Sequence, residues 1–200
     1  MSKLSKIFFR AMLVATIGLQ PLCSIAGGAW IESGSLAFLQ QERRVNLEYD
    51  YSDMEVGQNI KDCLPEQEYV ASQVTRLNAK KPGEGDAWRL EWIGQRISRL
   101  QPRFTQLLNK QFAADNIPLE FGEFKDAKYT LILKPKTMLP RSLTADVLFI
   151  QTGNRTNTLA VVKMVNIPGD GGGWGGVPDS SDAYANAGKN LGVLIRGKIK

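Results

Sequence analysis

An α+β fold is predicted for this chain, with a mixed sheet of about four strands and helices packed on one face. Three features predict it: an alternating strand at 44–51, two successive helical patterns, and three strand-like runs followed by a last helix. The expected order is strand, helix, helix, strand, strand, strand, helix. With 200 residues, the chain is long enough for an export segment and one such domain, expected over 44–200.

Residues 27–43 begin with glycine and serine and then become apolar, which predicts a lead-in segment with a short docked strand or turn. In the strand that follows, every second residue from Val45 to Tyr51 is apolar. The residues between them are polar and are expected to face water.

Pro65, followed by Glu66 and Glu68, predicts the start of a helix over about 65–78. Proline fits the first helical turn, and acids suit the positive end of the helix dipole. The turn-rich AKKPGEG at 79–85 is expected to end this helix.

Asp86 is a natural N-cap for a second, longer helix. The apolar stripe expected to face the core comprises Trp88, Ile93, Ile97, Leu100, Phe104, Leu107 and Leu108. Pro102 lies inside this pattern, so we expect a kink or a break near Leu100.

The three strand-like runs are YTLILK at 129–134, ADVLFIQ at 145–151 and LAVVKMVNI at 159–167. The last two are joined by TGNRTNT, which has the composition of a hairpin connection. The first and third are apolar almost throughout, as central strands are. A final helix is expected over about 181–196.

The first 26 residues are typical of a secretory signal peptide. Positions 1–10 carry basic residues and no acid, and the apolar stretch at 11–22 is too short to span a bilayer. Small residues precede a predicted cleavage between Ala26 and Gly27. The mature protein is therefore expected in the periplasm or outside the cell, without a stable membrane span.

Cys23 is a poor candidate for a lipid anchor, because Leu22 stands where the lipid-attachment pattern needs a small residue. Cleavage would leave Cys63 without a cysteine partner in the same chain, so no internal disulfide could form. A pairing between chains stays open, but an unreactive thiol at Cys63 is the favoured interpretation.

Histidine is absent from the whole sequence. This removes the commonest general base, the commonest zinc ligand and the catalytic dyads that depend on histidine. We therefore expect neither an enzyme nor a bound metal or cofactor. The net charge of +5 comes largely from the signal segment, and the remaining charges are mixed in sign, so nucleic-acid binding is not expected.

A glycine tract, GDGGGWGG at 169–176, matches the dinucleotide pattern G-x-G-x-x-G. Pro178 delays the next helix, whose amides would have to meet the pyrophosphate, so a nucleotide site is not expected. A mobile loop at the sheet edge is favoured. In the alternative, Asp170 and Trp174 are contacts for a partner or a sugar.

Two further clusters are candidates for chemistry. Glu48, Asp50, Asp53 and Glu55 fall within eight residues, and Glu48 and Asp50, which point the same way on a strand, could share a cation or act as paired carboxylates; a solvated strand face is the favoured interpretation. Trp88 and Trp92, one helical turn apart, could form a binding surface with Arg96 and Arg99. Core packing of the tryptophans with the arginines in solvent is the favoured alternative.

The segments DYSDMEVG at 50–57, NAKKPGEGDAW at 78–88 and AYANAGKNLG at 183–192 resemble a family of short, uncharacterised exported proteins of Gram-negative bacteria. The order of elements also resembles the domain shared by the amino-terminal part of TolB and by envelope accessory lipoproteins. The resemblance implies an envelope location and carries over no catalytic residues.

We expect an exported, non-enzymatic protein that binds an unidentified envelope protein through its sheet edge, glycine tract or last helix. One alternative is a small-molecule or glycan binder that uses Trp174 or the surface of Trp88 and Trp92. The other is a carboxylate-dependent enzyme.

Overall fold

The computed structural model describes residues 27–170, 172–174 and 177–199. The strands of the main sheet are β1 Gly28–Gly34, β2 Arg44–Tyr49, β3 Glu55–Val56, β4 Leu64–Pro65, β5 Glu120–Gly122, β6 Tyr129–Leu139, β7 Ser142–Gln151 and β8 Asn154–Pro168. The helices are α1 Glu66–Lys80, α2 Glu84–Gln95, α3 Gln101–Ala113 and α4 Ser181–Ile199, with a π-helical segment at Arg96–Leu100 and short 3-10 turns at Ala37–Gln41 and Ile60–Asp62. A separate ribbon pairs β9 Gly172–Trp174 with β10 Val177–Asp179.

The main sheet is mixed and has eight strands in the order β1-β8-β7-β6-β2-β5, with β3 and β4 attached beside β6. β6, β7 and β8 form an antiparallel meander, whereas β2 pairs in parallel with both β5 and β6. The predicted α+β class with a mixed sheet is therefore confirmed, but the prediction of about four strands is wrong. β3, β4 and β5 are two or three residues long, which is too short to show an alternating pattern.

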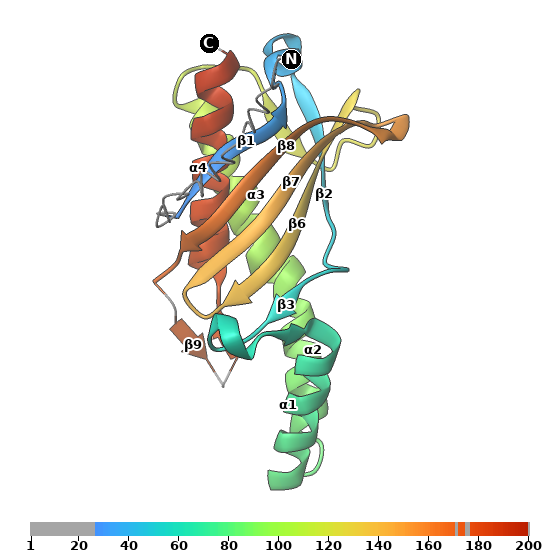
Figure 1. Ribbon diagram of the computed structural model, residues 1–200, viewed down its shortest axis with the longest axis vertical. Coiled ribbons are helices and arrows are strands. Elements are labelled where there is room, and N and C mark those ends of the chain that lie inside the picture. Colours follow the sequence, from blue (N-terminus) through green and yellow to red (C-terminus); the bar gives the residue numbers. More distant parts are fainter. Residues whose placement is uncertain (1–26, 171, 175–176, 200) are drawn as a thin grey trace, which may run out of the picture.

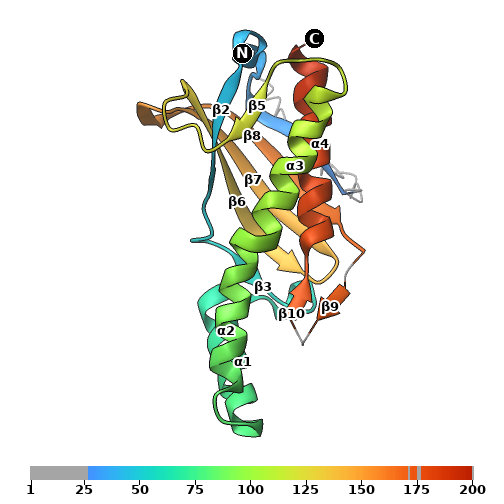
Figure 2. The same ribbon diagram turned by 180° about the vertical axis from the view of Figure 1, so that it is seen from behind.

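The core lies between one face of the sheet and helices α3 and α4 (Figure 2). Leu131 on β6, Val147 on β7 and Val162 on β8 belong to the same buried cluster as Phe104 on α3. The two helices approach closely at Gly188 of α4, where an added Cβ would lie 2.2 Å from the carbonyl oxygen of Phe104. The small residue at this position therefore has a packing reason.

Within the described part of the chain, no helix covers the opposite face of the sheet (Figure 1). Arg155, near the start of β8, nevertheless reaches Glu48 of β2, although β7 and β6 lie between these strands. The end of the β7–β8 hairpin therefore folds over this part of the face. Asn46 of β2, expected to face water, is only 4% exposed and donates hydrogen bonds to Glu48 and to Thr130 of β6.

Helices α1 and α2 form an antiparallel hairpin that projects beyond the sheet, and we call this hairpin the arm (Figures 1 and 2). From α2 the chain passes through the π-helical segment into α3 without leaving the helical path. The amide of Gln101 donates to the carbonyl of Arg96, which is a hydrogen bond of π-helical span. The irregularity expected near Leu100 is thus a widened turn just before Pro102.

In the first half of this long helix, the predicted apolar stripe is confirmed at Trp88, which is buried, and wrong at the next two positions. Ile93 is 50% exposed and Ile97 is 73% exposed, although both were expected in the core. Trp92 and Gln95 are buried there instead. The widened turn inserts one residue into the helical repeat, so the buried side of α2 follows a different register from that of α3.

Candidate functional site

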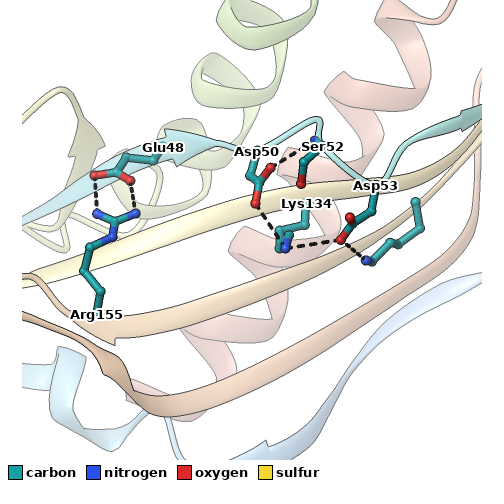
Figure 3. Close-up of polar contacts among 7 residues, drawn as sticks. Glu48, Asp50, Ser52, Asp53, Lys134 and Arg155 are labelled. Atoms are coloured by element: carbon teal, nitrogen blue, oxygen red, sulfur yellow. Dashed lines mark hydrogen bonds and ion pairs between the residues drawn. The ribbon is translucent and has the colours of Figure 1, made fainter. Parts of the chain in front are cut away.

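The acidic residues on and after β2 form ion pairs with cations from β6 and β8, and we call these pairs together the network (Figure 3). Arg155 binds both carboxylate oxygens of Glu48, at 3.2 and 2.7 Å. Lys134 on β6 lies 3.0 Å from Asp50 and 3.4 Å from Asp53. Each of these carboxylates thus has a cationic partner on the open face of the sheet.

This network also lowers the proton affinity of its carboxylates. The pKa of Asp50 falls to about 2, first because of hydrogen bonds from Ser52 and then because of Lys134. Arg155 lowers the pKa of Glu48, and Lys136 with Lys134 lowers that of Asp53. Carboxylates with lowered pKa values are weak general bases near neutral pH. No group of His, Cys, Asp and Glu among the described residues could hold a metal ion.

The two tryptophans of α2 lie inside the arm. Trp88 and Trp92 are 6% and 4% exposed, and their rings stack with centroids 5.3 Å apart. Tyr69 of α1 packs against both rings, at 6.3 and 5.5 Å. These three aromatic side chains form a small core that holds α1 against α2.

At the base of the arm, a polar cluster joins the hairpin to the sheet. Glu66 of α1 accepts a 2.8 Å hydrogen bond from Nε1 of Trp92 and forms an ion pair with Arg96. The Arg96 guanidinium also lies 4.2 Å from the centre of the Tyr51 ring, in cation–π contact. Arg96 was expected in solvent, but its side chain is only 22% exposed. The cluster fixes the direction in which the arm leaves the sheet.

A hollow of about 530 Å³ lies between α1 and α2, and we call it the arm groove. Its apolar lining comes from Val70, Ala71 and Val74 of α1 and from Trp92 and Ile93 of α2. Glu66, Arg89 and Arg96 lie at its polar margin. A second hollow, of about 500 Å³, shares Glu66 and Arg96 with it and is lined further by Asp53 and Glu55.

Beside the groove, α2 and the π-helical segment expose three large aliphatic side chains. Leu90, Ile93 and Ile97 are 69%, 50% and 73% exposed, and we call them the arm stripe. Their spacing of three and four residues places them on one side of the helix. Ile93 belongs to both features, so the stripe and the groove form one continuous apolar surface.

The glycine tract lies apart from the arm groove. Part of it forms the β9–β10 ribbon, and Asp170 is exposed and lines a smaller hollow with Arg103 of α3 and Asp182 of α4. Residues 171, 175 and 176 and the side chain of Trp174 lie outside the described residues. Gly169 packs tightly on α4, because an added Cβ would lie 2.6 Å from the amide nitrogen of Ala183.

The predicted signal segment, including Ala26 and Cys23, also lies outside the described residues. Gly27, expected as the first mature residue, is the first one described, and an added Cβ there would lie 2.2 Å from the carbonyl oxygen of Asn166. No described helix is both long enough and apolar enough to cross a membrane.

Burial and the neighbouring acids Glu55 and Asp62 raise the pKa of the Cys63 thiol, which makes the thiolate scarcer at neutral pH.

Sequence reasoning missed the groove and the stripe. Ile93 and Ile97 were assigned to the core, and Leu90, Val70 and Val74 were not considered for binding. The apolar repeat of α3, continued backwards at regular helical spacing, predicts that the wrong face of α2 is buried. It fails because the π-helical segment between them adds one residue to the repeat. The buried repeat of Trp88, Trp92 and Gln95 is the signal that could have shown the change of register.

Comparisons with known proteins give little further information. No family model and no curated protein matches the sequence. Among solved structures, the PelC dodecamer from Paraburkholderia phytofirmans is similar at 12% identity and a TM-score of 0.29, covering 82% of this chain and 99% of that chain. At so low a TM-score the likeness carries no argument about fold or function. The resemblance to exported proteins and to TolB-like domains stays a prediction.

Proposed function

We propose that this chain is an exported, non-enzymatic protein that binds a helical segment of a partner polypeptide through its arm. The observation that carries the proposal is the arm stripe beside the open arm groove. Leu90 and Ile93 on α2 and Ile97 on the π-helical segment are exposed, and the α1–α2 hairpin stands clear of the sheet (Figure 2). Exposed apolar surfaces of this kind mark interaction sites in proteins.

The chemistry of the surface suits a helix. An amphipathic helix lays side chains spaced by three and four residues into an apolar groove, and the arm offers the complementary spacing at positions 90, 93 and 97. Burying a large aliphatic side chain contributes up to roughly 1.5–3 kcal/mol, so these residues could supply the centre of an interface.

The base of the arm supports the same function. Arg96 is held by its ion pair with Glu66 and by the ring of Tyr51, while Trp92 also donates to Glu66. An arm fixed in this way presents its surface without first having to become ordered, which lowers the entropic cost of binding.

A small-molecule ligand is a second candidate, because the volume of the arm groove, about 530 Å³, is within the range of small-molecule sites. Trp92 is 4% exposed and offers little ring surface to a sugar. Leu90 and Ile97 are not among the residues that line the groove, so a ligand inside it would leave them exposed. A partner helix that covers both the arm groove and the arm stripe would bury more of the exposed apolar surface than a small molecule in the groove.

Photocrosslinking in the native host tests the proposal. A benzoylphenylalanine at position 90 or 97 is expected to give a discrete crosslinked protein, because both side chains are exposed in the arm stripe. The same group at Lys125, an exposed loop residue, serves as the control. Equal crosslinking from the arm and from position 125, or none from the arm, would reject partner binding by the arm.

Export is tested separately, by the mass of the protein isolated from its host. A chain that begins at Gly27 supports export, and a chain that retains residues 1–26 contradicts it. The same mass shows whether a lipid is attached.

A further inference from the structure

We infer that the helix bound by the arm belongs to a different protein from this chain and carries acidic residues on the flank that faces Arg89 and Arg96. The inference rests on the proposed function and specifies the chemistry of the partner. It follows from the charges that border the arm stripe.

The arm stripe has the spacing of a coiled-coil seam. Leu90, Ile93 and Ile97 are separated by three and then four residues, as the a, d and a positions of successive heptads are. In this register, Arg89 and Arg96 occupy the g positions on one flank of the seam. Charges at these flanking positions select the partner in helix pairs.

The two flanks of the seam differ in charge. Both arginines lie on the groove side, where they line the hollow together with Glu66. The opposite flank carries the small residues Ala87 and Gly94. Glu66 balances Arg96, so the ionisable residues that line the groove have a net charge of +1 from Arg89.

Arg89 is available to a partner. Its guanidinium lies 3.8 Å from Asp86, at the limit of an ion pair, and its side chain is 52% exposed. An acidic side chain that packs beside Ile93 would meet this cation at the edge of an apolar surface, where water is partly excluded and charge pairs are stronger than in bulk water.

A second copy of this chain fits the flanks poorly. In a parallel pair, the flank with Arg89 and Arg96 would face the flank with Ala87 and Gly94 of the other copy, which offers no acid. In an antiparallel pair related by a twofold axis, each flank faces the same flank of the other copy. Arg89 and Arg96 would then face Arg89 and Arg96 of the second copy across the seam. Like charges opposed in this way disfavour pairing. An acidic helix removes the conflict.

Two synthetic amphipathic helices of roughly three heptads test the inference. Both carry the same leucine and isoleucine seam; one has glutamate on its flanks and the other has lysine. Binding to the full chain is measured by fluorescence anisotropy at low salt. We expect the glutamate peptide to bind about tenfold more tightly than the lysine peptide.

Matched variants show whether the preference for the glutamate peptide over the lysine peptide comes from the arginines at the margin of the arm groove. Arg89→Gln is expected to reduce this preference about fivefold. Arg76→Gln, at an exposed arginine of α1 that does not line the groove, should leave it unchanged. Ile93→Gln should weaken both peptides, and circular dichroism shows whether each variant is folded.

The outcomes separate this inference from the proposed function. Equal binding of the two peptides, or a preference that survives Arg89→Gln, overturns the acidic partner; if Ile93→Gln still abolishes binding, the arm remains the binding site. A dimer in sedimentation that Ile93→Gln dissociates identifies a second copy as the occupant and also overturns the inference. If neither peptide binds and position 90 gives no crosslink, both proposals fail.

Discussion

The indole Nε1 of Trp92 donates a 2.8 Å hydrogen bond to the same Glu66 oxygen, Oε1, that pairs with Arg96. One carboxylate atom therefore links α1 to α2 and to the π-helical segment. Because Arg96 also stacks on Tyr51, the arm and the sheet are joined through this carboxylate. The groove and the cluster that orients it share Glu66 and Arg96.

Removing the charge of Glu66 should destabilise the protein. The side chains of Glu66 and Arg96 are 13% and 22% exposed, so Glu66→Gln leaves a cation that water screens only partly. We expect the free energy of unfolding in urea to fall by about 2 kcal/mol, between the values for exposed and buried pairs.

The control for this variant is Glu68→Gln, at an exposed position of the same helix. It should change the free energy of unfolding by less than about 0.5 kcal/mol. Similar effects of the two substitutions would show that the Glu66 pair does not hold the arm.

The change of register along the long helix predicts opposite effects for two apolar substitutions. Ile97 is 73% exposed, so Ile97→Ala should change the free energy of unfolding by less than about 0.5 kcal/mol. Leu108 is fully buried, and Leu108→Ala should lower it by about 3 kcal/mol. If Ile97→Ala were as destabilising as Leu108→Ala, the register of the structure would be wrong.

The same helix shows what the sequence could and could not predict. Its downstream stripe, at Leu100, Phe104 and Leu108, was predicted and is buried. Periodicity alone cannot locate an inserted residue, because each half of the helix fits a regular repeat separately. Pro102 indicated an irregularity nearby but gave no information about which face of α2 would be exposed.

The sheet shows a second limit. The long strands β6, β7 and β8 have apolar patterns that identify them without knowledge of their neighbours. β5 pairs with β2 through three residues only. It follows α3, so its place beside β2 is set by where α3 ends along the sheet (Figure 2). Such contacts are set by tertiary packing, so local sequence does not reveal them.

Acid should weaken the network on the open face of the sheet. The pKa of Asp50 is lowered from 3.8 to about 2, first by Ser52 and then by Lys134. Ionised Asp50 therefore stabilises the fold above the ordinary pKa, and this contribution is lost as the pH falls from 3.8 through about 2. Measured by urea unfolding across this pH range, the free energy of unfolding should fall more steeply for the wild type than for Asp50→Asn.

Plotted against pH, the unfolding free energies of the wild type and of Asp50→Asn should converge near pH 2, where Asp50 becomes protonated in the wild type as well. Parallel curves for the two proteins would mean that the ionisation of Asp50 is not linked to folding. Ser52→Ala provides an independent check: it removes the Ser52 hydroxyl, the largest cause of the lowered pKa, and keeps the backbone amide that donates to Asp50, so the pKa of Asp50 should rise part of the way in an NMR titration.

Glycines in two helices predict opposite effects of the same substitution. An added Cβ at Gly188 would lie 2.2 Å from the carbonyl oxygen of Phe104, whereas nothing lies within 4 Å of one at Gly94. Gly188→Ala must push α4 away from α3 and should lower the free energy of unfolding by about 2 kcal/mol. Gly94→Ala should raise it by up to about 1 kcal/mol, since alanine loses less backbone entropy on folding.

Gly94 is the matched control, because both glycines lie inside helices and receive the same methyl group. Only close packing distinguishes them, so the difference in unfolding free energy between the two variants measures the α3–α4 contact. Stabilisation by both substitutions would show that helix propensity dominates at both sites, and that α4 is not seated as closely on α3 as Gly188 and Phe104 indicate.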